Sequence, residues 1–405
     1  MPLLTRGHEA ATSAVRAMLV RAAPHAVLVS GPAGVGKTTL ALDLAAGLLC
    51  EAADVATRPC RECRGCRLVE RGVHADLHRI VPSGAGNQIR IGDRRDPEPG
   101  TIRRLIADLA LLPVEGGARV AIVERADRMN EDAQSALLKT LEEPPAGVTI
   151  LLCADREDQL LPTVRSRCVR LRLGPVPTRD VEAILGDLEV ADPSTASRLA
   201  RLSAGRPGVA RAWALAPEAI TARGEIARSL LDLTGAGPAR RLSIGRELLG
   251  RAAEILRELD RADRPTALTP TAGRGRRSRR SAAATVPVVV AGTQAVEGEQ
   301  PDEDGEPGRD LRAPAADRRR AAATFVEIWR DVTRDLLLVG LGEERRLRDP
   351  GLLDDLRAVK SVSATALSAF LVRLDDASEL IESNVSPELA VDVLLLAWPR
   401  GAEAA

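Results

Sequence analysis

Short apolar runs alternate with amphipathic stretches between residue 11 and about residue 172. Three of these runs have the length and the β-branched content of buried strands, namely AVLVS (26–30), RVAIVE (119–124) and VTILLCA (148–154). Strands that alternate with helical stretches are typical of a parallel sheet covered by helices. The pattern therefore predicts an α/β domain with a parallel sheet over residues 1–172.

The remainder of the chain has helical periodicity. From residue 173 to residue 240, Leu, Ala and Arg recur at helical spacing, interrupted by Gly205, Pro207 and Gly208. This stretch predicts a small helical lid domain. Helical spacing continues from residue 241 and ends in VDVLLLAW (391–398), which predicts an all-helical C-terminal domain over residues 241–405.

A passage of different composition interrupts this C-terminal domain. Residues 262–322 contain TPTAGRGRRSRRSAAA and EGEQPDEDGEPGRD, which are rich in Pro, Gly and charge. Such a segment has too few large apolar residues to offset the entropy lost on ordering. We therefore predict a disordered insertion over residues 262–322.

Composition changes this picture little. A length of 405 residues is typical of two or three domains. Lys plus Arg and Asp plus Glu both total 57, so any contact with nucleic acid requires a local basic surface. The N-terminus MPLLTRGHEA has no basic start followed by an apolar core, and no run reaches the length of a membrane span. We expect a cytoplasmic protein.

A glycine-rich motif follows the first predicted strand. Gly31, Gly34 and Gly36 precede Lys37 and Thr38 in the pattern G-x-x-x-x-G-K-[ST], and a helical stretch follows. In such a phosphate loop, backbone N–H groups face the phosphates, the Lys contacts the β and γ phosphates and the Thr hydroxyl reaches Mg²⁺. A tight turn before a helix is the alternative, but a turn does not require the Lys-Thr pair. The motif predicts binding of ATP with Mg²⁺.

The hydrolytic part of the site is incomplete. A working phosphate-loop ATPase has an Asp for Mg²⁺ at the end of a second strand, and many have a Glu as base after it. Here RVAIV ends in Glu124-Arg125. Glu124 can reach Mg²⁺ as a degenerate metal ligand, but Arg125 cannot accept a proton. In the other register Glu124 is the base and Val123 takes the metal position; a solvated strand end is a third interpretation. Hydrolysis by this chain is predicted to be weak or absent.

Four cysteines lie within 17 positions, and they are Cys50, Cys60, Cys63 and Cys66. Two pairs at C-x-x-C spacing can fold around a tetrahedral Zn²⁺, and four ligands leave no open position, so the site is predicted to be structural. A redox C-x-x-C is the alternative. Cys153 and Cys168 lie in apolar surroundings and are expected in the core. His74 and His78 are expected to serve packing or capping.

Two longer motifs complete a resemblance to a known family. They are ADRMNEDAQSALLKTLEEPP (126–145) and LLPTVRSRC (160–168). The first predicts a helix that Asn130 caps and Pro144 stops. With the phosphate loop and the cysteines, these motifs resemble the bacterial DNA polymerase III clamp-loader AAA+ subunits over residues 24–170. The resemblance implies an AAA+ domain, a helical lid and a C-terminal collar for oligomerisation.

The resemblance also assigns a role to Arg167. In the family, the Arg of the Ser-Arg-Cys motif is a finger that reaches the ATP site of the neighbouring subunit, and here that motif is Ser166-Arg167-Cys168. A cation supplied in trans can be worth 10³ to 10⁵ in kcat. The alternative is an Arg in a surface ion pair, which contributes little.

Departures from the family pattern indicate the subunit type. Motor subunits have an Asp-Glu pair where this chain has Glu124-Arg125, and they have a lid arginine where it has Gly208. The chain thus resembles the delta-prime type, which implies a hetero-pentameric loader acting with a sliding clamp and primer-template DNA within a DNA polymerase holoenzyme. Two alternatives stay open: an ATP-hydrolysing motor subunit, and a zinc-stabilised scaffold with a relic phosphate loop.

Overall fold

The computed structural model describes residues 2–83, 87–115, 117–262, 314–359, 362–382 and 385–401. The predicted insertion at 262–322 lies mostly outside these residues. Its predicted C-terminal limit is wrong, because helix α12 (Ala315–Gly340) begins eight residues earlier, at Ala315. The sequence AADRRRAAA consists largely of strong helix formers, and its last two alanines are buried. The charged composition therefore concealed the first turns of a helix.

A five-stranded parallel sheet forms the centre of the N-terminal region, with the strand order β2-β3-β4-β1-β5. Its strands are β1 (Ala26–Ser30), β2 (Leu77–Ile80), β3 (Arg119–Val123), β4 (Val148–Ala154) and β5 (Val169–Arg172). The predicted α/β fold with a parallel sheet is confirmed, and the three predicted strands are β1, β3 and β4. The two strands that the pattern did not single out have four residues each and contain Arg or His.

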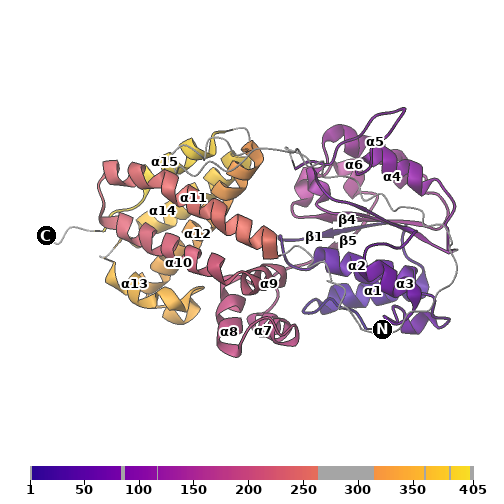
Figure 1. Cartoon of the computed structure of the whole chain (residues 1–405), viewed down its shortest axis with the longest axis horizontal. Helices are drawn as coiled ribbons and strands as arrows, with labels where there is room; N and C mark the ends of the chain where they lie inside the picture. Colours follow the sequence, from indigo (N-terminus) through magenta and orange to yellow (C-terminus); the bar gives the residue numbers. More distant parts are fainter. Residues whose placement is uncertain are drawn as a thin grey trace, which may run out of the picture. The chain divides into compact units, whose positions relative to one another are not determined.

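Helices cover both faces of this sheet (Figure 1). They are α1 (Glu9–Arg21), α2 (Lys37–Leu48), α3 (Arg64–Glu70), α4 (Ile102–Leu109), α5 (Glu131–Glu142) and α6 (Pro162–Arg165). The pleat of β1 divides its side chains between two apolar clusters. Leu28 packs with Leu105 of α4 and Leu137 of α5, whereas Val29 packs with Val15 of α1 and Leu40 of α2.

The rest of the described chain is helical, as predicted. The helices are α7 (Thr178–Asp187), α8 (Pro193–Leu202), α9 (Pro207–Leu215), α10 (Pro217–Asp232), α11 (Pro238–Ala262), α12, α13 (Leu353–Ala358), α14 (Ala364–Glu382) and α15 (Pro387–Ala397). One apolar cluster extends from Val176 to Trp398. At its centre, Trp329 contacts Phe325, Phe370 and Trp398 with ring centroids 5.2 to 5.4 Å apart. The boundary at residue 240 between a lid and a C-terminal domain stays a prediction.

None of the described helices is long and apolar enough to cross a membrane.

Candidate functional site

The phosphate loop connects the carboxyl end of β1 to the first residue of α2. Two of its glycines are required by the backbone. A Cβ on Gly31 would lie 2.2 Å from the carbonyl oxygen of Leu173, and Gly36, which precedes the helix, has a φ of 111°. The loop therefore has the strand, turn and helix context that its motif predicts, and Lys37 begins α2.

The ammonium group of Lys37 is fully engaged by the protein. Its Nζ donates to the carbonyl oxygens of Gly31 and Pro32, each at 2.8 Å, and lies 2.6 Å from Oδ1 of Asp155. An ammonium has three N–H donors, so these three acceptors satisfy all of them. The Lys37 side chain is only 7% exposed. In this conformation the chain itself occupies the cation of its phosphate loop.

Asp155 is a residue that the sequence reasoning missed. It follows the last residue of β4, and the backbone N–H of Gly31 donates to the carbonyl oxygen of Ala154 at 3.2 Å, which places Asp155 next to the loop. The available signal was its position, because ligand-binding groups of parallel sheets lie at the carboxyl ends of the strands. Its second oxygen lies 3.7 Å from Nε of Arg125.

Glu124 lies at the predicted place, within reach of Thr38. The Thr38 hydroxyl donates to Oε2 of Glu124 at 3.4 Å, while Nε of Arg79 donates to Oε1 at 3.0 Å. Arg79, on β2, is a second residue that the sequence reasoning missed, since β2 itself was not singled out. Arg125 follows with a φ of 51° and a side chain that is 40% exposed. The guanidinium thus stands near the site where a base would be needed, and it cannot accept a proton.

Helix α9 begins directly against the phosphate loop. The backbone N–H of Gly208 donates to the carbonyl oxygen of Gly34 at 2.8 Å. A Cβ on Gly208 would lie 3.0 Å from that oxygen and 3.2 Å from the Gly34 Cα. A long side chain at this position therefore requires the two backbones to separate, which agrees with the absence of a lid arginine here.

Arg167 lies just after α6 on a partly exposed surface. Its Nη1 donates to the carbonyl oxygen of Thr163 at 2.8 Å, and its Nη2 pairs with Glu142, the last residue of α5. The side chains of Arg167 and Glu142 are 33% and 48% exposed. This contact joins the LLKTLEEPP and Ser-Arg-Cys motifs. In the single chain, Arg167 forms the surface ion pair that the alternative interpretation describes.

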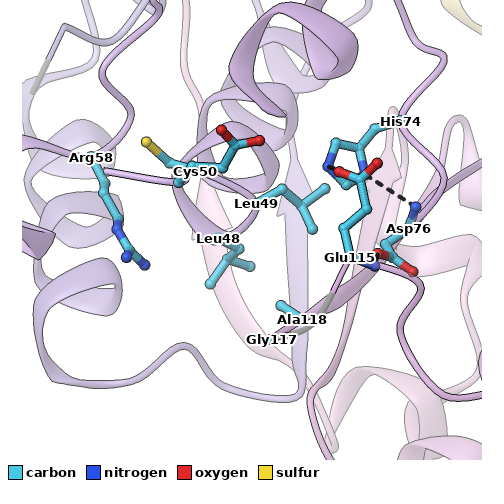
Figure 2. A pocket seen from close by; sticks show the side chains of 10 residues that line it. Leu48, Leu49, Cys50, Arg58, His74, Asp76, Glu115, Gly117 and Ala118 are labelled. Carbon is cyan, nitrogen blue, oxygen red and sulfur yellow. Dashed lines mark hydrogen bonds and ion pairs between the residues drawn. The ribbon is translucent and has the colours of Figure 1, made fainter. Parts of the chain in front are cut away.

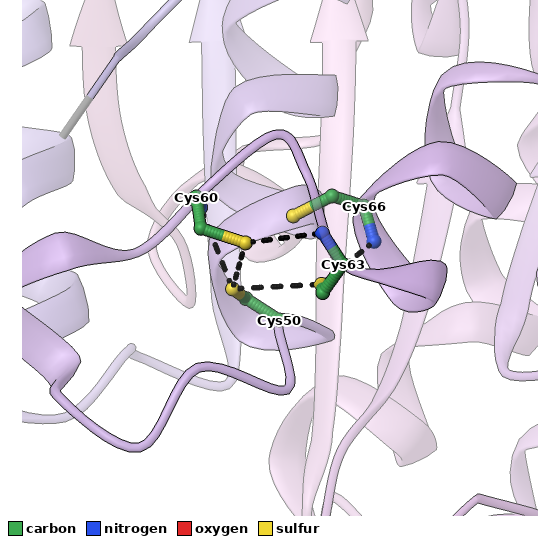
Figure 3. A group of neighbouring side chains, drawn as sticks. All are labelled: Cys50, Cys60, Cys63 and Cys66. Carbon is green, nitrogen blue, oxygen red and sulfur yellow. Dashed lines mark hydrogen bonds between the residues drawn. The ribbon is translucent and has the colours of Figure 1, made fainter.

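The four cysteines converge after α2 (Figure 3). The Sγ atoms of Cys50, Cys60, Cys63 and Cys66 all lie within 4.8 Å of one another. The distance from Cys50 Sγ is 3.5 Å to Cys60 Sγ and 3.9 Å to Cys63 Sγ. Tetrahedral thiolates on a metal at 2.3 Å would be roughly 3.8 Å apart, so the cluster could hold a metal ion.

Local backbone contacts prepare these thiols for a cation. The backbone N–H of Cys63 donates to Cys60 Sγ at 3.3 Å, and with the N–H of Glu62 it lowers the pKa of Cys60 to about 6. Burial raises the pKa of Cys66, whose own N–H donates to Cys63 Sγ at 3.4 Å. Four sulfurs with opposed pKa shifts form a closed set that a divalent ion would hold together.

The cysteine module is anchored to α2 through Asp43. This carboxylate is fully buried, pairs with Arg61 of the module, and accepts the backbone N–H groups of Leu4 and Thr5 at 3.0 and 2.9 Å. The module and the N-terminal segment are thus fastened to the helix that begins with Lys37.

A cavity of about 400 Å³ lies beside Cys50, and it is lined by His74, Asp76 and Glu115 among others (Figure 2). His74 and Asp76 precede β2, so the cavity lies at the amino ends of the strands, away from the phosphate loop. Nδ1 of His74 accepts the backbone N–H of Asp76 at 3.1 Å, which is the capping expected from the sequence. Asp76 in turn accepts the N–H groups of Val114 and Glu115.

The remaining cysteines and His78 have structural surroundings. Cys153 is buried in β4, and burial raises its pKa to about 12. Burial likewise raises the pKa of Cys168 to about 11, and its Sγ donates to the carbonyl oxygen of Val164 at 3.3 Å. Burial lowers the pKa of His78, whose Nδ1 lies 3.9 Å from Asp108.

Comparison with known proteins places the N-terminal region in a defined group. The family described as "DNA polymerase III, delta subunit" matches residues 8–177. The DNA polymerase III subunit delta' of Pseudomonas aeruginosa is 40% identical over 146 residues, covering 36% of this chain and 42% of that protein. The delta' subunit of Escherichia coli is 34% identical over 46% of this chain and 54% of its own length.

A second subunit type is also similar. The DNA polymerase III subunit tau of Salmonella typhimurium is 38% identical over 165 residues, which cover 41% of this chain and 23% of that protein. The chain thus spans about half or less of the length of the relatives it matches. The similarity concerns the region that carries the sheet, the phosphate loop and the cysteines.

Proposed function

We propose that this chain, which the family match and the delta' relatives support as a clamp-loader subunit of the delta-prime type, assists ATP hydrolysis in a neighbouring subunit and hydrolyses little or no ATP itself. It works in a hetero-pentameric loader of the DNA polymerase III holoenzyme. There it helps to load the sliding clamp on primer-template DNA.

The observation that carries this proposal is the pair of side chains after β3. Glu124 contacts Thr38 and so can still serve a bound Mg²⁺, but Arg125 stands where a general base is needed. Loss of a general base lowers a rate by about 10² to 10⁴. The engagement of Lys37 by Asp155 acts in the same direction, because it leaves the ammonium without a free donor. Mg-ATP, where it binds, contacts the loop Gly31–Thr38.

Arg167 provides the assistance in trans. Its partner Glu142 is half exposed, so the ion pair contributes little and a phosphate of a neighbouring subunit can displace it. The guanidinium is planar and can contact two phosphate oxygens at once. A subunit with damaged hydrolysis is then indispensable for a neighbour.

The ion held by Cys50, Cys60, Cys63 and Cys66 is Zn²⁺. Four thiolates leave no open coordination position, so the ion supplies folding energy and no catalysis. Its position after α2 fixes the module on the helix that follows the phosphate loop.

The decisive experiment uses Arg167→Ala in a reconstituted loader with its clamp and primed DNA. We expect the isolated variant to fold and to bind nucleotide as the wild type does, while hydrolysis at the one adjoining site falls by a factor of about 10³ or more. Clamp loading falls with it, and Arg167→Lys restores little because an ammonium lacks the planar fork.

The matched control is Arg170→Ala, which removes an exposed arginine three residues further along. This control should load clamps at the wild-type rate. Wild-type loading by an Arg167→Ala loader that assembles normally would refute the trans role.

A further inference from the structure

We propose that Asp155 is a specificity-determining residue of the phosphate loop, which makes the site disfavour nucleoside triphosphates relative to diphosphates. Its carboxylate neutralises Lys37 from within the chain, at a loop whose motif evolved to meet a phosphate. This inference rests on the proposed weak use of the nucleotide site, but it does not depend on Arg167.

The backbone holds Asp155 beside the loop. Strands β1 and β4 pair in parallel with Ser30 opposite Ala154, so the residues that follow them, Gly31 and Asp155, are neighbours. The backbone N–H of Asp155 donates to Oδ1 of Asp127 at 2.9 Å, and the Asp155 side chain is only 22% exposed. The carboxylate is therefore positioned by the sheet and by a buried neighbour.

Two cations converge on this carboxylate. Lys37 Nζ lies 2.6 Å from Oδ1, and Arg125 Nε lies 3.7 Å from Oδ2. The other two donors of Lys37 reach Gly31 and Pro32, so releasing the ammonium breaks three contacts at once. The second carboxylate of the site, Glu124, is paired with Arg79. The positive charges that a phosphate loop offers to a ligand are thus matched by carboxylates of the chain.

A third phosphate meets this arrangement unfavourably. It adds negative charge and needs the Lys37 ammonium, so its binding requires Asp155 to lose its partner in a partly buried place. A diphosphate carries less charge and can rely on the backbone N–H groups at the start of α2. Removing the carboxylate leaves both Lys37 and Arg125 available, which benefits the more highly charged ligand most.

The test measures the dissociation constants of Mg-ADP and of a non-hydrolysable Mg-ATP analogue on the full chain by calorimetry. We expect the wild type to prefer the diphosphate. Asp155→Asn keeps the shape of the side chain and removes its charge, and it should tighten triphosphate binding by about tenfold, equivalent to 1.4 kcal/mol, while diphosphate binding changes by less than about threefold.

The matched control is Asp158→Asn, which removes an exposed carboxylate three residues further along and should leave both constants unchanged. Asp155→Ser serves as a second neutral variant if the Asn variant unfolds at a lower temperature. An unchanged preference in both neutral variants, or no nucleotide binding by any variant, overturns the proposal. Either outcome leaves the loader experiment on Arg167 unaffected, so the two failures are distinguishable.

Discussion

The two ends of helix α2 carry the two intact motifs of this chain, and they differ in what satisfies them. At the first residue, the Lys37 ammonium meets two carbonyl oxygens and a carboxylate of its own chain. Just beyond the last residue, four cysteine sulfurs gather within 4.8 Å of one another. Thiols are weak hydrogen-bond partners, so such a cluster gains most from an ion.

This difference separates a motif from an available site. Both motifs match their patterns in sequence, yet only the cysteine cluster is left needing a ligand. The phosphate loop was completed from elsewhere in the chain, by Asp155 after β4 and Gly208 before α9. An intact motif therefore predicts a local conformation better than it predicts occupancy.

The largest expected effect breaks the cysteine end. Cys66→Ser replaces a fully buried thiol of the cluster, and we expect loss of the proposed zinc and destabilisation by more than about 4 kcal/mol. Metal analysis and denaturant unfolding measure both effects. Cys168→Ser, outside the cluster, should retain the metal. A Cys66→Ser protein with wild-type metal content and stability would contradict the zinc assignment.

A smaller effect shows what an internally satisfied charge contributes. Asp349 is buried and accepts from Nε of Arg198 at 3.0 Å and from Nη1 of Arg223 at 3.2 Å. Asp349→Ala leaves the buried Arg223 short of a partner, so we expect a loss of about 3 to 5 kcal/mol in unfolding free energy.

The control for this variant is Glu225→Ala, which removes an exposed partner of Arg251 and should change the denaturation midpoint little. Equal midpoints for the two variants would show that internal satisfaction is worth little here, and the contrast drawn between the two ends of α2 would weaken with it.

The smallest expected effect concerns the pair that joins the two family motifs. Glu142→Ala removes the exposed partner of Arg167, and we expect less than about 1 kcal/mol of destabilisation. Thermal unfolding of the isolated chain measures it. A loss above about 2 kcal/mol would mean that Arg167 is committed to its own subunit, which conflicts with a role in trans.

Sequence predicted the fold where apolar patterns are long. The strands β1, β3 and β4 were found from runs of five to seven buried residues. Asn130 was predicted to cap a helix, and its Oδ1 accepts the N–H of Ala133 at 3.0 Å at the start of α5. Strand β5 was missed because VRLR is mostly exposed and carries two arginines.

Sequence predicted the site only as far as local motifs extend. The glycines, Lys37 and the cysteines lie in short contiguous patterns. Asp155 and Arg79 belong to the same site through strand pairing, since Asp155 lies 118 positions after Lys37 and Arg79 lies 45 positions before Glu124. Such partners are set by sheet topology, which a pattern of residues along one segment does not contain.

The most direct test of the account is steady-state hydrolysis of Mg-ATP by the purified chain, compared with Lys37→Ala. The account predicts no turnover above that of the variant, because Arg125 stands in place of a base and Asp155 already holds the loop lysine. Robust turnover by the wild-type chain that Lys37→Ala abolishes would contradict it and would identify this chain as a motor subunit.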